Sequence, residues 1–186
     1  MIGFAMCGSF CTLDKTVGVM QQLISLGYEI LPIVSDAVYG TDTRFGTAEA
    51  LRERVTALCG RGIVHTSPDA EPLGPRVSLD ALLICPCTGN TLAKLANGIT
   101  DTPVTMAVKA HLRSDRPLLI TLASNDAMSA NLGNMSVLLS RKHVFFTPLV
   151  QDDPLRKPHS LVADFSLVPS ALAAALRREQ LRPLFR

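Results

Sequence analysis

The sequence has no tryptophan, little charge and no long apolar run, and these absences narrow what the protein can be. Charged residues make up 18% of the 186 residues and the formal net charge is +2, so the basic surface typical of nucleic-acid binding is missing. No apolar run approaches the roughly 20 residues of a membrane helix. The opening residues, MIGFAMCGSF, lack the basic region and cleavage site of a signal peptide. We therefore expect a cytoplasmic protein that binds neither nucleic acid nor a membrane.

The five cysteines argue against a disulfide framework and do not form a typical zinc motif. Five is an odd number, and in a chain of this size it indicates reduced thiols rather than a disulfide framework. Cys7, Cys11, Cys85 and Cys87 fall at predicted strand ends or in the adjacent turns, where they could in principle gather around zinc. Structural zinc sites more usually show Cys-x2–4-Cys pairs on knuckles. We favour buried free thiols that pack as small hydrophobic groups, and we expect no metal site.

Short apolar runs alternate with segments of helical spacing along most of the chain. Between Thr12 and Gly27, for example, apolar residues recur every three or four positions. We expect strands at 2–7, 28–34, 81–85, 117–122 and 144–146, with a further short one at 63–65. We expect helices at about 13–26, 48–58, 91–96, 104–113, 127–139 and 169–178. This alternation predicts one domain over residues 1–186, an α/β fold with a three-layer, doubly wound parallel sheet of the Rossmann or flavodoxin type.

The most informative segment is 81–102, ALLICPCTGNTLAKLANGITDT. An apolar run reads as a buried strand that Pro86 ends, and a polar turn from Thr88 to Thr91 then starts a helix that stops at Asn97-Gly98. Open α/β sheets place ligands at such strand-to-helix turns. The free N–H groups of the helix start, with the threonine hydroxyls, suit an anion such as phosphate. The alternative is a plain N-capped turn that binds nothing.

Small polar turns follow three other predicted strands, at Gly8-Ser9, Ser35 and Ser124-Asn125. The carboxyl ends of parallel strands meet at one edge of a sheet, so we expect these turns to converge with the turn at 88–91. Hydroxyls, amides and backbone N–H groups without a fixed positive charge suit a monoester phosphate or the polar edge of a flavin. Neither GxGxxG nor GxxxxGK[ST] occurs, so the usual dinucleotide and P-loop fingerprints are absent.

Three loops complete the predicted organisation. Residues 39–46 form a polar loop in which Asp42 or Thr43 caps the following helix, and the proline-containing loop 66–78 is expected to lie over the site. The charged, proline-rich stretch at 150–164 is expected to be an extended arm. Its length suits a solvated linker or an arm that reaches a neighbouring copy in a homo-oligomer.

The central segment resembles that of a known family. The stretch CPCTGNTLAKLANGITD resembles the flavin-binding segment of the homo-oligomeric flavin-containing cysteine decarboxylases. The resemblance implies an FMN site. The matching cofactor-binding positions are Gly8, Ser9, Ser35, Pro86, Thr88, Gly89, Asn90, Thr91 and Asn125. Within that group the chain is more similar still to the B-type subunits of dipicolinate synthase, through TDTRFG (41–46), AEPLGP (70–75), SNDAM (124–128) and QDDPLRKPHSLVAD (151–164).

This closer resemblance implies a function as well as a fold. It implies an oxidoreductase component that contributes to the dehydration and oxidation of 4-hydroxy-tetrahydrodipicolinate to dipicolinate (pyridine-2,6-dicarboxylate) in the mother cell of a sporulating bacterium. It implies a partner, the A-type subunit of dipicolinate synthase, which carries NADP, and a homo-oligomer built as a trimer or a multiple of one. Two alternatives stay open: a non-catalytic scaffold or regulator of the A-type subunit, and an FMN-dependent decarboxylase like the rest of the group.

Departures from the decarboxylases count against the last alternative. Their catalytic histidine has no counterpart at 70–73, and their Pro-Ala-Met-Asn string reads Leu122-Ala-Ser-Asn125 here. The catalytic residues are therefore unknown, with His111 and Lys109 as weak candidates. The candidates for holding substrate carboxylates are Arg44, Arg113 and Lys157, while Lys94 supports packing.

Overall fold

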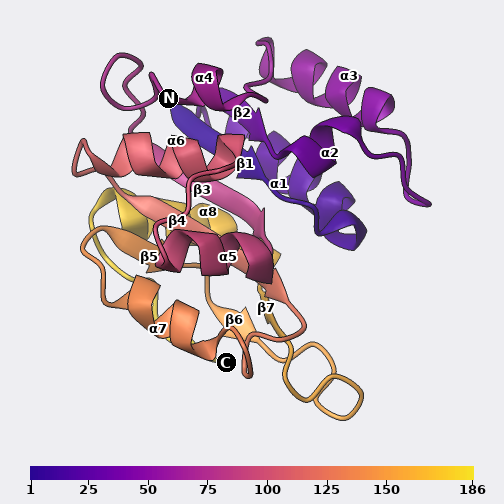
Figure 1. The fold of residues 1–186 in the computed structure, drawn as a ribbon, viewed down its shortest axis with the longest axis vertical. Helices are drawn as coiled ribbons and strands as arrows, with labels where there is room; N and C mark the ends of the chain where they lie inside the picture. The colour runs from indigo at the N-terminus through magenta and orange to yellow at the C-terminus, as the bar shows by residue number, and fades with distance from the viewer.

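The computed structural model describes residues 1–186 as a seven-stranded sheet with helices on both faces (Figure 1). The strands are β1 (Ile2–Met6), β2 (Ile30–Val34), β3 (Ala81–Cys87), β4 (Leu118–Ser124), β5 (Val144–Phe146), β6 (Leu149–Val150) and β7 (Leu161–Ala163). The first five strands run parallel in the order 2-1-3-4-5, which is the flavodoxin order. β1 lies between β2 and β3, so the winding of the sheet reverses there. This fold is the one predicted from the sequence.

The helices are α1 (Leu13–Ser25), α2 (Asp36–Gly40), α3 (Ala48–Cys59), α4 (Ser67–Ala70), α5 (Gly89–Ala96), α6 (Pro103–Leu112), α7 (Leu132–Leu139) and α8 (Val168–Leu176), with 3-10 turns at Phe10–Thr12 and Phe165–Leu167. Alternate residues of the central strands point to opposite faces and form two separate cores. Leu82, Ile84 and Cys87 of β3 join the core beneath α5, α6 and α7. Leu83 and Cys85 join the core beneath α1 and α8. Every residue of β3 is buried, as expected of a central parallel strand.

The helix boundaries predicted from glycine and threonine are largely confirmed. Gly27 and Gly98 end α1 and α5 with positive φ angles of 89° and 72°. Thr88 caps α5 by accepting a hydrogen bond from the backbone N–H of Thr91 at 3.2 Å. One predicted cap is wrong: Thr47, rather than Asp42 or Thr43, caps α3. Asp42 still contributes, because its Oδ1 accepts from the N–H of Ala48 at 2.8 Å.

The central strand is longer than predicted. β3 continues through Pro86 to Cys87, with a cis Cys85–Pro86 bond and a shift in its register with β4. Pro86, which has no N–H to donate, lies at this irregularity in the ladder, and its carbonyl accepts a hydrogen bond from the N–H of Cys7 at 3.1 Å. The predicted stop at Cys85 is therefore corrected by two residues.

Residues 146–164 differ most from the prediction. β5 is not the last strand, because β6 and β7 form an antiparallel pair and β7 pairs with the end of β4. The predicted arm at 150–164 is thus anchored in the sheet through β7, and 151–160 is the loop that projects from it at the lower right of Figure 1. We call residues 151–160 the arm from here on.

Three further segments correct the prediction. The helix expected at 127–139 begins only at Leu132, because residues 125–131 form turns. The expectation that 66–78 lies over the site is wrong. This loop packs against α6, where a Cβ on Gly74 would lie 2.5 Å from the carbonyl oxygen of Ala110. The strand expected at 63–65 is a single parallel bridge from Val64 to Ile33. No helix is long and apolar enough to span a bilayer.

Candidate functional site

The four polar turns predicted from the sequence lie at one edge of the sheet, where β1, β2, β3 and β4 end. We call this the four-turn edge, and it comprises Gly8-Ser9, Ser35, Thr88–Asn90 and Ser124-Asn125. Neighbouring turns are joined directly. The N–H of Ser35 donates to the carbonyl of Met6 at 3.0 Å, and the N–H of Cys7 donates to the carbonyl of Pro86. In the flavodoxin strand order this edge carries the ligand at the β1/β3 switch point.

The β1 and β2 turns form one end of the four-turn edge. A Cβ on Gly8 would lie 3.5 Å from the Phe10 ring and 3.6 Å from Cβ of Ala37, so the β1 turn lies against the start of α2. Ser35 caps α2 and accepts from the N–H of Val38 at 3.4 Å. Ser9 is half-buried and its side chain makes no capping hydrogen bond, so its hydroxyl is available to a ligand.

In the central turn, the two threonine hydroxyls, which the sequence analysis expected to face an anion, bond within the protein. Thr88 donates to Oγ1 of Thr91 at 3.2 Å, and the Thr91 hydroxyl donates to Sγ of Cys7 at 3.3 Å. Thr91 is buried, so its hydroxyl ties α5 to β1 and is directed away from an external anion. Pro86 is also buried inside β3, while Asn90 is exposed. Of this set, Thr88 and Asn90 present their side chains at the edge.

The β4 turn contains an acidic group that the sequence analysis missed. The carboxylate of Asp126 accepts from the hydroxyl of Ser124 and from Nδ2 of Asn131 at 3.0 Å. These hydrogen bonds, that of Ser124 first, lower the pKa of Asp126 and keep it ionised. Asn125 next to it is exposed. The signal available in the sequence is the Ser-Asn-Asp string, which is typical of an Asx-type turn as well as of a helix start.

Gly89 allows the β4 turn to approach α5. A Cβ built on Gly89 would lie 2.6 Å from Oγ of Ser124, 2.7 Å from Nδ2 of Asn131 and 2.8 Å from Oδ1 of Asp126. Contacts this short leave no room for a methyl group unless the β4 turn moves. The third and fourth turns are therefore packed together at the first residue of α5.

The arm borders the β4 end of the same edge. The hydroxyl of Ser160 donates to the carbonyl of Ser124 at 3.3 Å, and the N–H of Met128 donates to the carbonyl of His159 at 2.9 Å. Lys157, on the arm, pairs with Asp152 at 2.7 Å, which raises the pKa of Lys157 and lowers that of Asp152. The arm is thus attached to the turn that carries Asp126.

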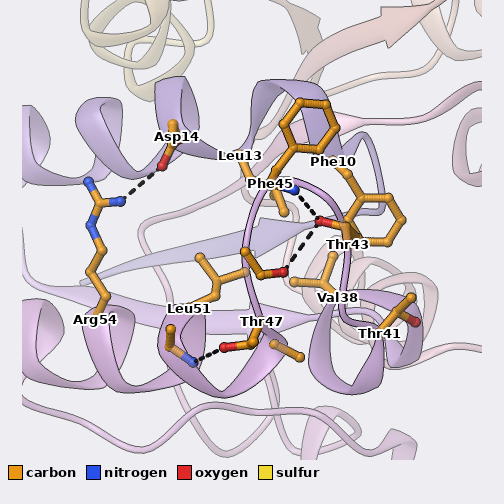
Figure 2. Close-up of a pocket in the computed structure, with 13 residues that line it drawn as sticks. Phe10, Leu13, Asp14, Val38, Thr41, Thr43, Phe45, Thr47, Leu51 and Arg54 are labelled. Atoms are coloured by element: carbon orange, nitrogen blue, oxygen red, sulfur yellow. Dashed lines mark hydrogen bonds and ion pairs between the residues drawn. The ribbon is translucent and has the colours of Figure 1, made fainter.

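A cavity of about 140 Å³ lies beyond Phe10 at the β1–β2 end (Figure 2). Apolar side chains from α1, α2 and α3 line it, and the 41–47 loop closes one side. Thr43 holds this loop by accepting from the N–H of Phe45 at 3.1 Å. On the opposite side Arg54 pairs with Asp14 at 3.0 Å and so joins α3 to α1. The cavity was not predicted, because its walls come from two stretches of sequence, 10–14 and 38–54, that meet only in the folded chain.

Three of the other candidate residues lie at the opposite edge of the sheet from the four turns. Arg44 is exposed on the 41–47 loop, with its guanidinium 4.8 Å from the centre of the Phe45 ring. Lys109, His111 and Arg113 belong to the last turn of α6, which leads into the beginning of β4, so they lie at the opposite edge of the sheet. His111 is fully buried, and its Nε2 lies 3.0 Å from the carbonyl oxygen of Pro117.

Lys94 links two helices rather than pointing at a ligand. Its Nζ lies 2.9 Å from both carboxylate oxygens of Asp101, which lowers the pKa of that carboxyl group. The pair joins α5 to the residues before α6, as the predicted packing role requires.

Four of the five cysteines have raised thiol pKa values. Burial raises the pKa of Cys7 to about 11 and that of Cys85 to about 12, and it raises the pKa of Cys87 well above its usual value. Partial burial raises the pKa of Cys59 to about 11. Cys11 is the exposed thiol. No group of three or more His, Cys, Asp or Glu side chains is arranged to hold a metal ion.

Comparison with known proteins shows the family of the chain. The family model described as Flavoprotein matches residues 1–163. The chain is 41% identical over 183 residues to the B-type subunit of dipicolinate synthase from Bacillus subtilis (strain 168), and the match covers 98% of this chain and 92% of that protein. A crystal structure of the same type of subunit from Bacillus halodurans superposes with a TM-score of 0.91 at 38% identity, covering 100% of this chain and 95% of that one.

More distant structures share the fold. DmrB of Burkholderia xenovorans, solved in complex with FMN, has a TM-score of 0.69 at 19% identity and covers 95% of this chain and 94% of its own. The FMN-dependent cysteine decarboxylase SpaF has a TM-score of 0.68 at 24% identity, with 95% of each chain covered.

Proposed function

Because the chain belongs to the flavoprotein family and is a homologue of the B-type subunit of dipicolinate synthase, we propose that it binds FMN at the four-turn edge and acts as the B-type component of a two-component dipicolinate synthase. The observation that carries this proposal is the convergence of the four turns at the β1/β3 switch point, on the strand order that places FMN there. Family membership alone would not choose this edge over the 140 Å³ cavity.

The residues at the edge fit a flavin nucleotide. Gly8 offers a turn without a side chain, and Ser9 and Thr88 offer hydroxyls without a competing fixed charge. Backbone N–H groups and hydroxyls of this kind hold a phosphate ester, while the amides of Asn90 and Asn125 suit the polar edge of a ring. When bound, FMN supplies a two-electron acceptor. Gly8, Ser9 and Thr88 would help to orient it through neutral hydrogen-bonding groups.

The proposed reaction is the loss of one water, two electrons and two protons from cyclic 4-hydroxy-tetrahydrodipicolinate, which yields pyridine-2,6-dicarboxylate. Such a substrate needs cations for two carboxylates. Lys157 on the arm is the candidate cation whose segment is attached to the four-turn edge. A partner, the A-type subunit with NADP, is proposed to complete the reaction, and the cytoplasm of the mother cell is its proposed place.

A second candidate function, a scaffold or regulator of the A-type subunit, is favoured by one observation. The four turns contain no histidine, lysine or arginine, and His111 lies at the opposite edge of the sheet. A general base for the ring C–H would then come from the A-type subunit. Decarboxylation is the third candidate, because FMN-dependent cysteine decarboxylases share the fold. Release of carbon dioxide from a cysteinyl peptide would identify it.

The first test is the visible absorption spectrum of the purified chain before and after addition of FMN. Flavin bands that co-elute with the protein in gel filtration support the proposed site. A chain that stays colourless and leaves added FMN in the unbound fraction contradicts it, and the scaffold function then takes precedence. A second test measures dipicolinate formation by the A-type subunit together with this chain or with its Thr88→Ala variant. A lower rate with the variant supports a catalytic component, and an equal rate supports a scaffold.

A further inference from the structure

Asp126 occupies an unusual place for a carboxylate at a nucleotide-binding edge. It follows Asn125 in the β4 turn and is half-buried, with Ser124 and Asn131 as its hydrogen-bond donors. Both donors come from its own segment. Those contacts leave Oδ2 with one donor, Nδ2 of Asn131, so this oxygen can still accept a hydrogen bond from a ligand.

The carboxylate lies against the positive end of a helix. Oδ1 of Asp126 would be 2.8 Å from a Cβ on Gly89, the first residue of the eight-residue helix α5. The first N–H groups of a helix attract an anion, and a carboxylate there is stabilising. In this chain Asp126 already supplies that negative charge, so an additional anion at the start of α5 would face an ionised carboxylate.

We propose that Asp126 is a specificity-determining residue, which makes the α5 end of the four-turn edge accept N–H donors of a neutral or cationic ring and reject a second anion. This inference rests on the proposed function in one respect: it takes the four-turn edge as the place where a ligand binds. The phosphate of a nucleotide is then directed to Gly8-Ser9 and Ser35, and a ring that carries N–H groups faces Asp126. Thr91, predicted from the sequence as an anion ligand, instead closes the helix start from inside, because its hydroxyl donates to Sγ of Cys7.

A purely structural role for Asp126 makes a different prediction. If the carboxylate only fastened the β4 turn through Ser124 and Asn131, its removal would lower stability without changing the preference for anions. Asp126→Asn keeps the size of the side chain and removes the charge. Asp126→Glu keeps the charge and disturbs the hydrogen-bond geometry. Anion binding therefore separates the two roles.

The test is a calorimetric titration of the full chain with inorganic phosphate in low-salt buffer. Asp126→Asn is expected to bind phosphate about tenfold more tightly than the unaltered chain, the order expected when one nearby unit charge is removed at a half-exposed site. Asp126→Glu is expected to stay within about twofold of the unaltered chain. Glu53→Gln, an exposed change on α3 with the same net-charge effect, is the control and is expected to change nothing. Added salt should reduce the difference.

Equal phosphate affinity in Asp126→Asn and the unaltered chain overturns the proposal, and this includes the result that neither binds. An Asp126→Glu variant that binds phosphate as tightly as Asp126→Asn also overturns the proposal, because the gain in affinity would then not come from the loss of the charge. If Asp126→Asn loses its circular dichroism spectrum, Asp126→Ser, which keeps a hydroxyl for Asn131, takes its place. A chain that fails to bind FMN while Asp126→Asn gains phosphate leaves this inference standing and rejects the proposed function.

Discussion

The hydroxyl of Thr91 in α5 lies 3.3 Å from Sγ of Cys7, the residue that follows β1. The two residues are 84 positions apart in the sequence, and their contact joins α5 to the end of β1, beside the point where the sheet reverses its winding. Because both side chains are buried, this contact fixes the position of the central turn from within the protein.

We predict that Thr91→Val lowers the free energy of unfolding by about 1 kcal/mol, because Thr88 loses its hydroxyl acceptor and Cys7 its donor. Urea denaturation measures the change, and FMN titration should show weaker binding. Thr56→Val, at an exposed position on α3, is the matched control. A Thr91→Val protein as stable as the control would contradict the structural role of this contact.

Two glycines should respond in opposite directions to alanine. Gly89→Ala is expected to cost about 1–3 kcal/mol, because the new methyl group would displace Ser124, Asn131 and Asp126. Gly133→Ala on α7 meets no atom within 4 Å and should stabilise the chain by about 0.5–1 kcal/mol through helix propensity. Thermal unfolding of the two variants measures both changes in stability. Equal changes would show that the β4 turn can move to make room for the methyl group.

His111 should affect stability rather than ligand binding. Burial lowers its pKa in the folded protein, with a smaller opposing effect from the hydrogen bond to Pro117. Below the unfolded pKa of about 6.5, the unfolded chain binds more protons than the folded one, so this residue's contribution to stability is lost as pH falls.

We expect the stability advantage of the unaltered chain over His111→Gln to shrink between about pH 7 and about pH 5 in urea denaturation. FMN affinity should be the same in both, since His111 lies at the opposite edge of the sheet. A constant advantage across this range would show that the histidine does not titrate there. A loss of FMN affinity would return His111 to the candidates for the site.

The arm is expected to contact a neighbouring copy of the chain in the proposed homo-oligomer. Leu155 at its tip is 95% exposed, which is unusual for a leucine. We predict that replacing 152–158 by a short Gly-Ser linker, or changing Leu155→Ser, reduces the mass measured by light scattering. Leu26→Ser, at an exposed position after α1, is the control. Unchanged mass and unchanged FMN binding in both arm variants would remove the arm from assembly and from the site.

The parts of the fold that sequence reasoning predicted are those with strong local signals. The buried runs of β1, β3 and β4 and the stops at Gly27 and Gly98 needed no long-range information. The convergence of the four turns followed from the parallel sheet, because carboxyl ends of parallel strands share an edge.

The parts that were missed depend on contacts between distant segments. β6 and β7 have two and three residues, too few for a recognisable alternation, and pair only because β4 extends past β5. The start of α7 was placed too early, because Asp126 takes donors from Ser124 and Asn131 and holds the chain in turns. The 140 Å³ cavity forms where residues 10–14 lie beside residues 38–54, and neither stretch of sequence predicts this contact by itself.

The uneven burial of the cysteines has a practical consequence. Four thiols are protected by raised pKa values, whereas Cys11 is exposed two residues after Ser9. Near neutral pH a maleimide dye should therefore attach at a single native position beside the β1 turn, because the thiolate is the reacting species. The chain thus carries its own attachment point for a fluorescent reporter of ligand and partner binding, without any engineered residue.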